Sequence, residues 1–265
     1  MSAQAILAGL FPPRDEQLWN PKILWQPIPV HTVPVQDEKL LHFPMPGCKR
    51  FYQLLKETMG STEVQSTLKS QMEFLGQMAK NMGYDVKSLM DFNNHKLWNA
   101  YDTLLVQKIH RKQLPSWANE DSIARLKFLM EYAVTAIFGI HKQEEKSRLQ
   151  GGNLVKAILD KITKASQSND EPKMVMYSAH DITIIALQIA LGVFNRKLPP
   201  YSSCQFFELY KEGSGHTIEM YYRNSTYEQP HQLVLPSCTA SCPLEKFKDL
   251  VSPIITNDWA GDCNK

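Results

Sequence analysis

Several features of membrane, nucleic-acid-binding or disordered proteins are missing from this sequence of 265 residues. No apolar run approaches the roughly 20 residues that a helix needs to cross a bilayer. The formal net charge is only +2, so no charge excess favours nucleic acid or an anionic membrane as a partner. Apolar residues make up 43% of the chain, which is enough to build a core. The sequence therefore predicts a folded protein with no membrane span and no nucleic-acid partner.

Two common hydrolase motifs are also missing. The sequence contains no Gly-x-Ser-x-Gly and no His-Glu-x-x-His, which disfavours a serine hydrolase or a zinc hydrolase. The pair Cys238 and Cys242 has a spacing that zinc could use, but no second pair of ligands follows at a suitable distance. We therefore expect no metal site and no cofactor.

The amino terminus lacks the basic leading segment of a signal peptide. The stretch MSAQAILAGLFPP predicts a helix over residues 1–13 that stops at Pro12 and Pro13. A chain that opens in a helix, with no leader, is expected to be part of something longer and not to be secreted as written. The sequon at Asn224 would nevertheless accept a glycan in the secretory route, so the compartment stays open.

Five cysteines are present. Cys238 and Cys242 frame the sequence CTASC and are close enough for a small disulfide loop. Cys48 and Cys263 lie near the two ends of the chain, and Cys204 is left over. Paired cysteines favour an oxidising compartment.

A long block from Lys49 to about Gln150 has helical hydrophobic spacing and few glycines. Apolar residues recur at intervals of three and four in four stretches, 51–60, 62–83, 86–110 and 121–141. Asn119 is the expected N-cap of the last stretch. The Met, Phe and Leu stripes are more typical of a core than of cofactor contacts. We therefore expect residues 49–150 to form an α-helical insert.

The remaining segments, 1–48 and 151–265, predict an α/β core. Turn-forming residues mark a boundary at 42–48, and helices are expected over 151–167, 181–192 and the start of 242–255. The strand candidates are an irregular or edge strand at 22–35, a short buried strand at 173–179, and a hairpin of 204–212 with 216–224. Together these patterns predict an α/β fold in one domain over residues 1–265.

His180 and Asp181 stand side by side where the predicted strand 173–179 meets the following helix. Ligands collect beyond the carboxyl ends of strands in α/β sheets, and helix N-termini attract anions. A phosphate would suit this place, with His180 as a donor and Asp181 as a general acid whose pKa is raised by burial. The alternative is that Asp181 is an ordinary N-cap and His180 a satisfied core histidine. From the pair alone, the alternative is favoured.

Several segments in the right order resemble the histidine acid phosphatases, and the resemblance covers nearly the whole chain. These segments are YSAHD (177–181), KSRLQGG (146–152), WQPIPVHTVP (25–34), LPPYSSC (198–204), EMYYRN (219–224) and LPSCTASCPLEKF (235–247). The resemblance implies a histidine-phosphatase-type sheet flanked by helices and hydrolysis of phosphate monoesters at acid pH through a phosphohistidine.

The resemblance also assigns individual residues. It implies that His180 binds phosphate and that Asp181 donates a proton to the leaving alcohol, with no metal because arginines neutralise the phosphate charge. It pairs Cys48 with Cys263 and Cys238 with Cys242, and it gives Cys204 a partner at the position of Val106, so Cys204 is expected to be a free thiol. It further implies a phosphate monoester or inorganic phosphate as ligand, a homodimer as an assembly, and a secreted or lysosomal location.

One part of the family pattern is not found. The family nucleophile lies in an Arg-His-Gly-x-Arg-x-Pro motif, yet none of the eight histidines is preceded by Arg or followed by Gly. We therefore assign no nucleophile and expect an N-terminally truncated relative that lacks the first central strand. Unpaired backbone groups beside strand 173–179 would then cost ~1–3 kcal/mol each where they are buried. The alternative to an acid phosphatase is a catalytically inactive relative, a pseudoenzyme.

Overall fold

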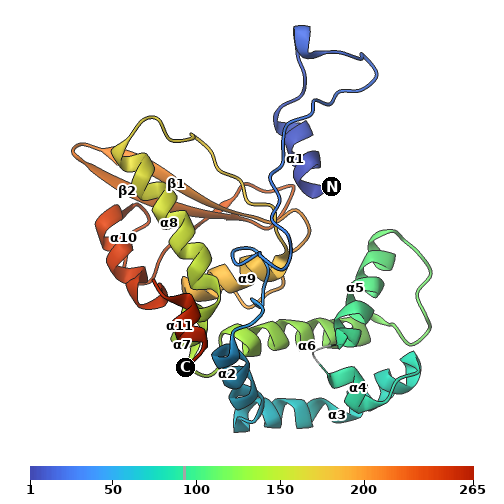
Figure 1. Cartoon of the computed structure of the whole chain (residues 1–265). Helices are drawn as coiled ribbons and strands as arrows, with labels where there is room; N and C mark the ends of the chain where they lie inside the picture. The colour runs from blue at the N-terminus through green and yellow to red at the C-terminus, as the bar shows by residue number, and fades with distance from the viewer. Residues whose placement is uncertain (92–93) are drawn as a thin grey trace.

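The computed structural model describes residues 1–91 and 94–265 and is mostly helical (Figure 1). The helices are α1 (Ser2–Leu10), α2 (Lys49–Met59), α3 (Thr62–Met82), α4 (Val86–Met90), α5 (Lys96–Ile109), α6 (Glu120–Phe138), α7 (Gln143–Leu149), α8 (Gly151–Gln167), α9 (Asp181–Ala190), α10 (Leu244–Val251) and α11 (Trp259–Cys263). Short 3-10 turns, η1 (Asp15–Gln17) and η3 (Ser252–Ile254), accompany them. The strands are β1 (Cys204–Glu212), β2 (Gly215–Arg223), β3 (His231–Leu233) and β4 (Cys242–Pro243).

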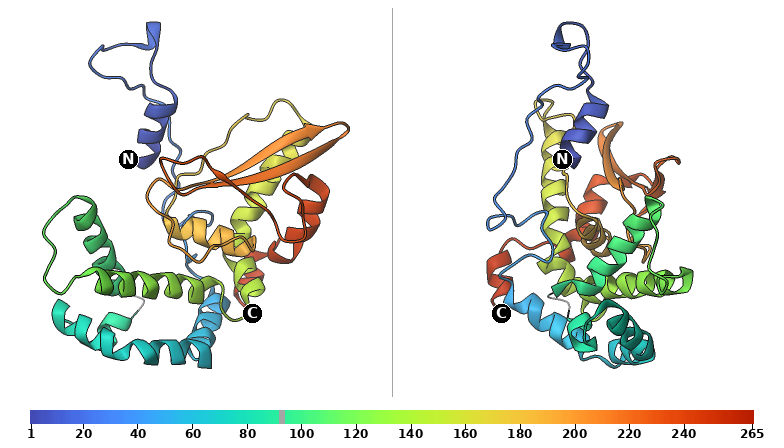
Figure 2. Two further views of the ribbon diagram at one scale, coloured as in Figure 1. Left: turned by 180° about the vertical axis from the view of Figure 1, so that it is seen from behind. Right: turned by 90° about the vertical axis from the view of Figure 1, so that its right-hand side faces the viewer.

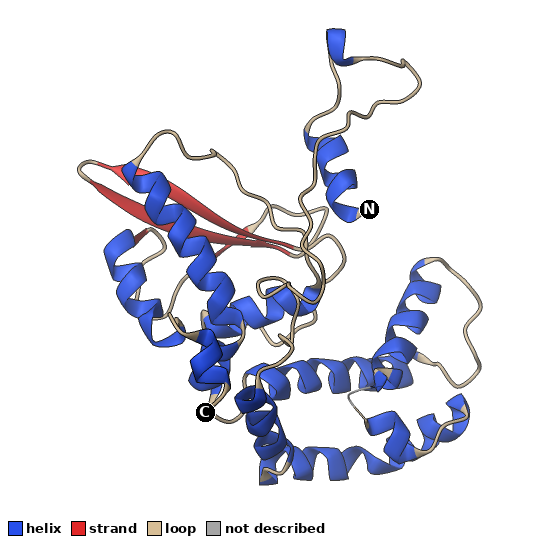
Figure 3. Cartoon of the chain, in the orientation of Figure 1, coloured by secondary structure: helices blue, strands red, loops and turns tan. Residues whose placement is uncertain are grey.

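The strands form one antiparallel sheet, drawn in red in Figure 3. β1 and β2 make the predicted hairpin, and Gly213 takes the positive φ of 59° that its turn requires. Ile218, Met220 and Tyr222 are buried on β2, two residues apart, as expected for a strand with one face on the core. On the neighbouring strand β1, Leu209 pairs with Ile218. β3 and β4 both pair with β2, so β2 is the central strand.

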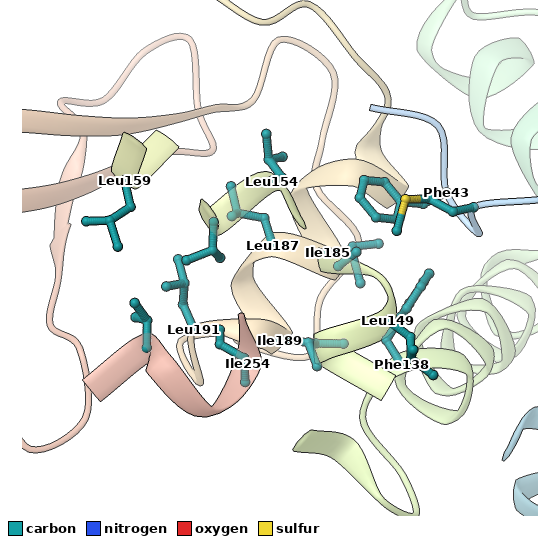
Figure 4. Packing of buried hydrophobic residues seen from close by; sticks show 14 of the residues in the cluster. Phe43, Phe138, Leu149, Leu154, Leu159, Ile185, Leu187, Ile189, Leu191 and Ile254 are labelled. Atoms are coloured by element: carbon teal, nitrogen blue, oxygen red, sulfur yellow. The ribbon is translucent and has the colours of Figure 1, made fainter. Parts of the chain in front are cut away.

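The main hydrophobic core lies between the sheet and helices α7, α8, α9 and α10. α9 runs through its centre, with Ile185, Leu187 and Ile189 packed inside (Figure 4). The amphipathic α8 lies alongside and contributes Leu154 and Leu159. This arrangement and the hairpin confirm the predicted α/β class, with the sheet on one side and helices against it.

The start of α8 approaches α9 and η3 closely because two glycines begin the helix. A Cβ on Gly151 would lie 2.2 Å from the carbonyl oxygen of Ala186 on α9. A Cβ on Gly152 would lie 1.9 Å from the carbonyl oxygen of Ile254. Both distances are far below any real carbon contact, so the Gly-Gly pair is what lets these backbones meet.

A second hydrophobic cluster lies within the helical block of α3 to α6. Its buried members include Leu75, Met78, Leu104 and Leu126. Asn119 is the N-cap of α6, as predicted, because its Oδ1 accepts a 2.9 Å hydrogen bond from the Ser122 amide. Figure 2 shows the block from two further sides, with the helices arranged around one another.

The helical block is not detached from the main core. Phe51 and Leu54 on α2 and Phe138 at the end of α6 belong to the main cluster. Trp98 and Leu198 pack against both clusters. The bounds 49–150 for an insert within one domain over 1–265 remain a prediction, since packing joins the two clusters at these residues.

The predicted helix over 86–110 is two helices, α4 and α5, and the part of that prediction at 92–93 lies outside the described residues. His95, which directly precedes α5, has a positive φ of 52°, so its backbone is not helical. The helix expected over 1–13 is confirmed as α1, although none of its residues is buried. The helix α11 was not predicted.

The buried strand predicted at 173–179 is wrong. All these residues are described, none belongs to a strand, and all are exposed, with 58% of Met174 accessible. The reason is that the described chain offers this segment no neighbouring strand, so its backbone groups face solvent and the expected cost of burying them unpaired does not arise. The irregular or edge strand predicted at 22–35 is wrong as well, because these residues form no strand and run as a mostly exposed irregular stretch.

The disulfide pattern follows the resemblance. Cys48 is bonded to Cys263, with 4.5 Å between the Cα atoms, and Cys238 is bonded to Cys242. Cys204 is free and exposed at the start of β1. In residues 1–91 and 94–265, no helix combines the length and apolarity that crossing a membrane would take.

Candidate functional site

His180 and Asp181 lie at the point where an extended segment becomes α9. His180 is the N-cap residue, with extended backbone angles, and Asp181 is the first residue of the helix. Asp181 therefore does not take the N-cap position of the alternative interpretation, and its Oδ1 accepts a 2.7 Å hydrogen bond from the amide of Ile182. His180 is exposed, so it is also not a buried core histidine. Both side chains lie at the surface end of a helix that is mostly buried from Thr183 onward.

Two opposing effects act on the Asp181 carboxyl. Burial raises its pKa above the usual value, and the Ile182 amide and the neighbouring His180 lower it. The charge of Asp102 adds a further contribution that raises the pKa. The net shift is upward, so the proton is held to a higher pH than on an ordinary aspartate. A half-buried carboxyl with a raised pKa at a helix start is suited to donate a proton.

The start of α9 is anchored to a distant segment. The hydroxyl of Thr183 donates a 2.7 Å hydrogen bond to the carbonyl oxygen of Leu41, and it accepts one of 3.4 Å from the His180 amide. Farther along the helix, Gln188 Nε2 donates to Gln205 Oε1 at the beginning of β1. These contacts fix the position and direction of the helix that carries Asp181.

Two residues that the sequence did not single out lie in the same region. Tyr201, in the loop between α9 and β1, donates a 2.8 Å hydrogen bond through its hydroxyl to Oδ1 of Asp102 on α5. Burial, this hydrogen bond and the charges of Asp102 and Asp181 raise the pKa of Tyr201 to about 12. Tyr201 lies in the segment LPPYSSC, which carried part of the family resemblance, but nothing in the sequence pattern of α5 marked Asp102.

A buried lysine lies in the core away from this site. Lys146 on α7 is fully buried, and its Nζ donates to the carbonyl oxygens of Ala136 and Ile140 and to the hydroxyl of Thr58. Burial lowers its pKa to about 8. Because its acceptors are a carbonyl in the last turn of α6, a carbonyl just after that helix and the Thr58 hydroxyl on α2, Lys146 ties α2, α6 and α7 together.

The other predicted site residues are placed as follows. Asn224 follows β2 in a half-buried loop, and nothing in the structure tests a glycan there. Cys204 is exposed as a residue, but partial desolvation of its thiol raises the pKa of that group. In the part of the chain that the structure describes, no cluster of three or more His, Cys, Asp or Glu side chains is arranged to hold a metal ion.

The comparisons with known proteins agree with the sequence segments. Residues 1–223 match the family described as histidine phosphatase superfamily (branch 2). The chain is 48% identical to prostatic acid phosphatase of Mus musculus over 264 residues, which is 99% of this chain and 68% of that protein. It is 47% identical to the Homo sapiens prostatic acid phosphatase, of which it covers 67%. It is 45% identical to the Bos taurus lysosomal acid phosphatase, of which it covers 61%.

The family match covers most of this chain, and the similarity to several phosphatases covers 99% of it, which goes well beyond a short shared motif. The predicted α/β fold and the paired cysteines agree with it. The chain therefore belongs to branch 2 of the histidine phosphatase superfamily.

Proposed function

We propose that His180 and Asp181 form the phosphate-binding and proton-donating half of a site for phosphate monoester hydrolysis. His180 binds a phosphate oxygen from the exposed end of α9. Asp181 gives its proton to the ester oxygen as the phosphorus–oxygen bond breaks, so that the alcohol leaves neutral and Asp181 becomes a carboxylate. No metal or organic cofactor enters this proposal.

The observation that carries this proposal is the raised pKa of Asp181 at the start of α9. A general acid must hold its proton at the working pH, and burial helps Asp181 to do so. The exposed His180 beside it leaves the ring accessible to a ligand. The positive end of the helix dipole supports an anion at the same place.

The nucleophile of the family reaction is not supplied by these 265 residues, because none of their histidines stands in an Arg-His-Gly sequence. This observation favours a second candidate function, in which the chain binds phosphate or a phosphate monoester without turning it over. A bound water could attack in place of a histidine, but without the motif's arginines the charge of the transition state is poorly stabilised.

The test compares binding with turnover. The purified, oxidised chain is assayed with p-nitrophenyl phosphate at acid pH beside prostatic acid phosphatase of Mus musculus. We expect the rate to be lower by at least about 100-fold, the usual effect of losing one preorganised stabilising group. Calorimetry with inorganic phosphate should show binding that is lost in His180→Ala and retained in His110→Ala, a change at an exposed histidine on the end of α5.

The outcomes separate the two candidates. Slow turnover that Asp181→Asn abolishes would support a residual phosphatase, whereas binding without turnover would support the second candidate. Absence of phosphate binding to the folded chain would refute both. Rapid turnover with a phosphoryl group trapped on a histidine would overturn the assignment of the missing nucleophile.

A further inference from the structure

A cavity lies between α5 and α6 in the helical block, where Figure 1 shows the two helices meeting at an angle. Its volume of about 540 Å³ falls within the range of roughly 300–1,000 Å³ that small-molecule sites usually have. Within the described residues, its lining comes only from these two helices and not from α9, which begins with Asp181. A ligand in this cavity would therefore contact neither His180 nor Asp181.

The wall of the cavity on α5 is apolar. Tyr101, Leu105 and Ile109 are spaced four residues apart, so they lie on one face of the helix. This apolar stripe is about 12 Å long, from the rise per residue of a helix. Tyr101 is only 6% exposed, whereas Ile109 is 56% exposed. The stripe therefore runs from the core of the helical block to the surface, and its outer part faces solvent.

The wall on α6 combines apolar and charged residues. Ile123 is buried and Ala124 is exposed, and Glu120 and Lys127 lie three residues to either side of them on the same face. Both carboxylate oxygens of Glu120 accept hydrogen bonds from Nζ of Lys108 on α5, at 2.7 and 2.6 Å. The charges of Glu120 and Lys108 therefore neutralise each other.

Lys127 is the cation of the cavity that lacks a close partner. Its side chain is 49% exposed, and its Nζ is 3.8 Å from Oε1 of Glu131, which is too long for a hydrogen bond. The two oxygens of Glu131 already accept hydrogen bonds from the Leu198 amide and from Nζ of Lys197. The cavity thus carries one incompletely paired positive charge beside an apolar surface.

We propose that this cavity binds a medium-chain fatty acid from solution, with its carboxylate on Lys127 and its alkyl chain along Leu105 and Ile109. A carboxylate is the complementary group for an ammonium, and the alkyl chain removes the exposed part of the stripe from water. A cationic amphiphile would find no such partner, because Glu120 is already bonded to Lys108. Small-molecule sites are typically apolar with a few polar groups that fix the ligand's orientation, and this cavity has that composition.

The experiment titrates the full oxidised chain with sodium decanoate by calorimetry. Decyltrimethylammonium and 1-decanol serve as the cationic and neutral ligands with the same alkyl chain. We expect one decanoate per chain, and binding of decyltrimethylammonium that is weaker by at least about fivefold, the effect of one exposed ion pair. Saturating inorganic phosphate should leave the decanoate affinity unchanged, because the cavity does not include His180 or Asp181.

The charge of Lys127 is tested by substitution. Lys127→Gln should weaken decanoate binding about two- to fivefold and leave 1-decanol binding unchanged, since only the charge interaction is lost. The matched control is Lys161→Gln, which removes the charge of an exposed lysine on α8. It should leave both affinities unchanged.

The apolar stripe is tested at its exposed end. Ile109→Ser should weaken the binding of both decanoate and 1-decanol about threefold or more, because it removes apolar surface that the alkyl chain covers. The control is Val106→Ser, at a position of α5 that is 36% exposed and does not line the cavity. Circular dichroism and thermal unfolding confirm that each variant is folded.

Isoleucine methyl NMR locates the ligand in the wild-type chain. Decanoate should shift the methyl signals of Ile109 and Ile123, which line the cavity, and should leave the signal of Ile218 on β2 unchanged. Shifts that spare both Ile109 and Ile123 would place the ligand elsewhere and overturn the proposal.

Four further results would also overturn the proposal. They are a folded chain that does not bind decanoate, equal affinities for decanoate and decyltrimethylammonium, an unchanged decanoate affinity in folded Lys127→Gln, and displacement of decanoate by inorganic phosphate. Binding to phosphatidylserine vesicles without binding of decanoate would overturn the assignment to a fatty acid from solution. Each of these results leaves the proposed function of His180 and Asp181 standing, because that function is tested by phosphate binding and turnover.

Discussion

Cys48 and Cys263 are joined by a disulfide although 215 positions separate them in the chain. Cys48 precedes α2 and Cys263 ends α11, and both are buried in the main core. The bond therefore closes a loop that contains most of the protein and ties the entrance of the helical block to the carboxyl terminus.

Removing this bond should destabilise the protein strongly. A loop of this length restricts the unfolded chain by about 5 kcal/mol in the entropy model, against a typical total stability of about 5–15 kcal/mol. We expect Cys263→Ala to lose most of its free energy of unfolding in urea titrations. The short loop between Cys238 and Cys242 predicts a cost of only about 2 kcal/mol for Cys238→Ala. Equal losses in the two variants would contradict the dependence on loop length.

The second prediction concerns the unpaired Cys204. One thiol per oxidised, denatured chain should react with a thiol reagent, because the other four cysteines are bonded. Val106 is 36% exposed and lies one turn after Asp102 on α5, which contacts the loop just before Cys204 through Tyr201. Val106→Cys should therefore form a bridge with Cys204 and leave no reactive thiol.

That engineered bridge should also raise the urea midpoint of unfolding, since it closes a long loop. Gln107→Cys is the control, because the adjacent position on a helix points about 100° away from Val106. Two reactive thiols are expected in that variant. Two thiols in Val106→Cys as well would mean that α5 and the start of β1 are not in bonding range.

The third prediction follows from the Gly-Gly pair at the start of α8. A methyl group on Gly152 would lie 1.9 Å from the Ile254 carbonyl oxygen, so Gly152→Ala must push two backbones apart. We expect a loss of about 2 kcal/mol or more in the free energy of unfolding. Gly76→Ala on α3 is the control, because a Cβ there meets no atom within 4 Å.

Gly76→Ala should be neutral or stabilising by about 0.5–1 kcal/mol, since alanine favours a helix. The same Gly→Ala change is therefore expected to lower the free energy of unfolding at position 152 and to leave it unchanged or raise it at position 76. A neutral Gly152→Ala would show that α8 can move away from η3 without cost.

The fourth prediction concerns acid stability. Glu57 on α2 forms ion pairs with His141 at 3.0 Å and Lys142 at 3.2 Å, and with Arg50 at 3.8 Å. Hydrogen bonds from His141 and Lys142 lower its pKa from 4.5 to about 2. A lowered pKa in the folded state means that the carboxylate contributes stability above pH 4.5. This contribution is lost as the pH falls towards about 2.

Urea unfolding of wild type and Glu57→Gln at several pH values measures this contribution. The two chains should differ most above pH 4.5 and converge near pH 2, and 1 M salt should reduce the difference because the Glu57 side chain is partly exposed. Glu73→Gln on α3, an exposed glutamate, should match wild type throughout. A constant difference between wild type and Glu57→Gln across this range would exclude a titrating ion pair.

The sequence alone determined much of this molecule. Helical spacing placed the helices of the block, the Asn119 cap placed the start of α6, and alternation placed the hairpin of β1 and β2. These predictions are correct because the signals behind them are local. The spacing of apolar residues, a side chain that caps its own helix and a turn glycine each act within a few positions of the sequence. The disulfide pairs and the family followed from the resemblance of several segments.

Tertiary structure decided the rest. The segment 173–179 has a strand-like sequence, but a strand exists only with a neighbour to pair with, and the described chain provides none there. Asp102 carries no signal on α5, and it becomes relevant only because the fold brings it 2.8 Å from Tyr201. The pKa of Asp181 is raised mainly by burial, which depends on the packing of the whole chain and is contained in no local pattern. Helix and turn propensities are determined by residues that are neighbours in the sequence. Strand pairing, burial and long-range charge interactions depend on how the whole chain packs.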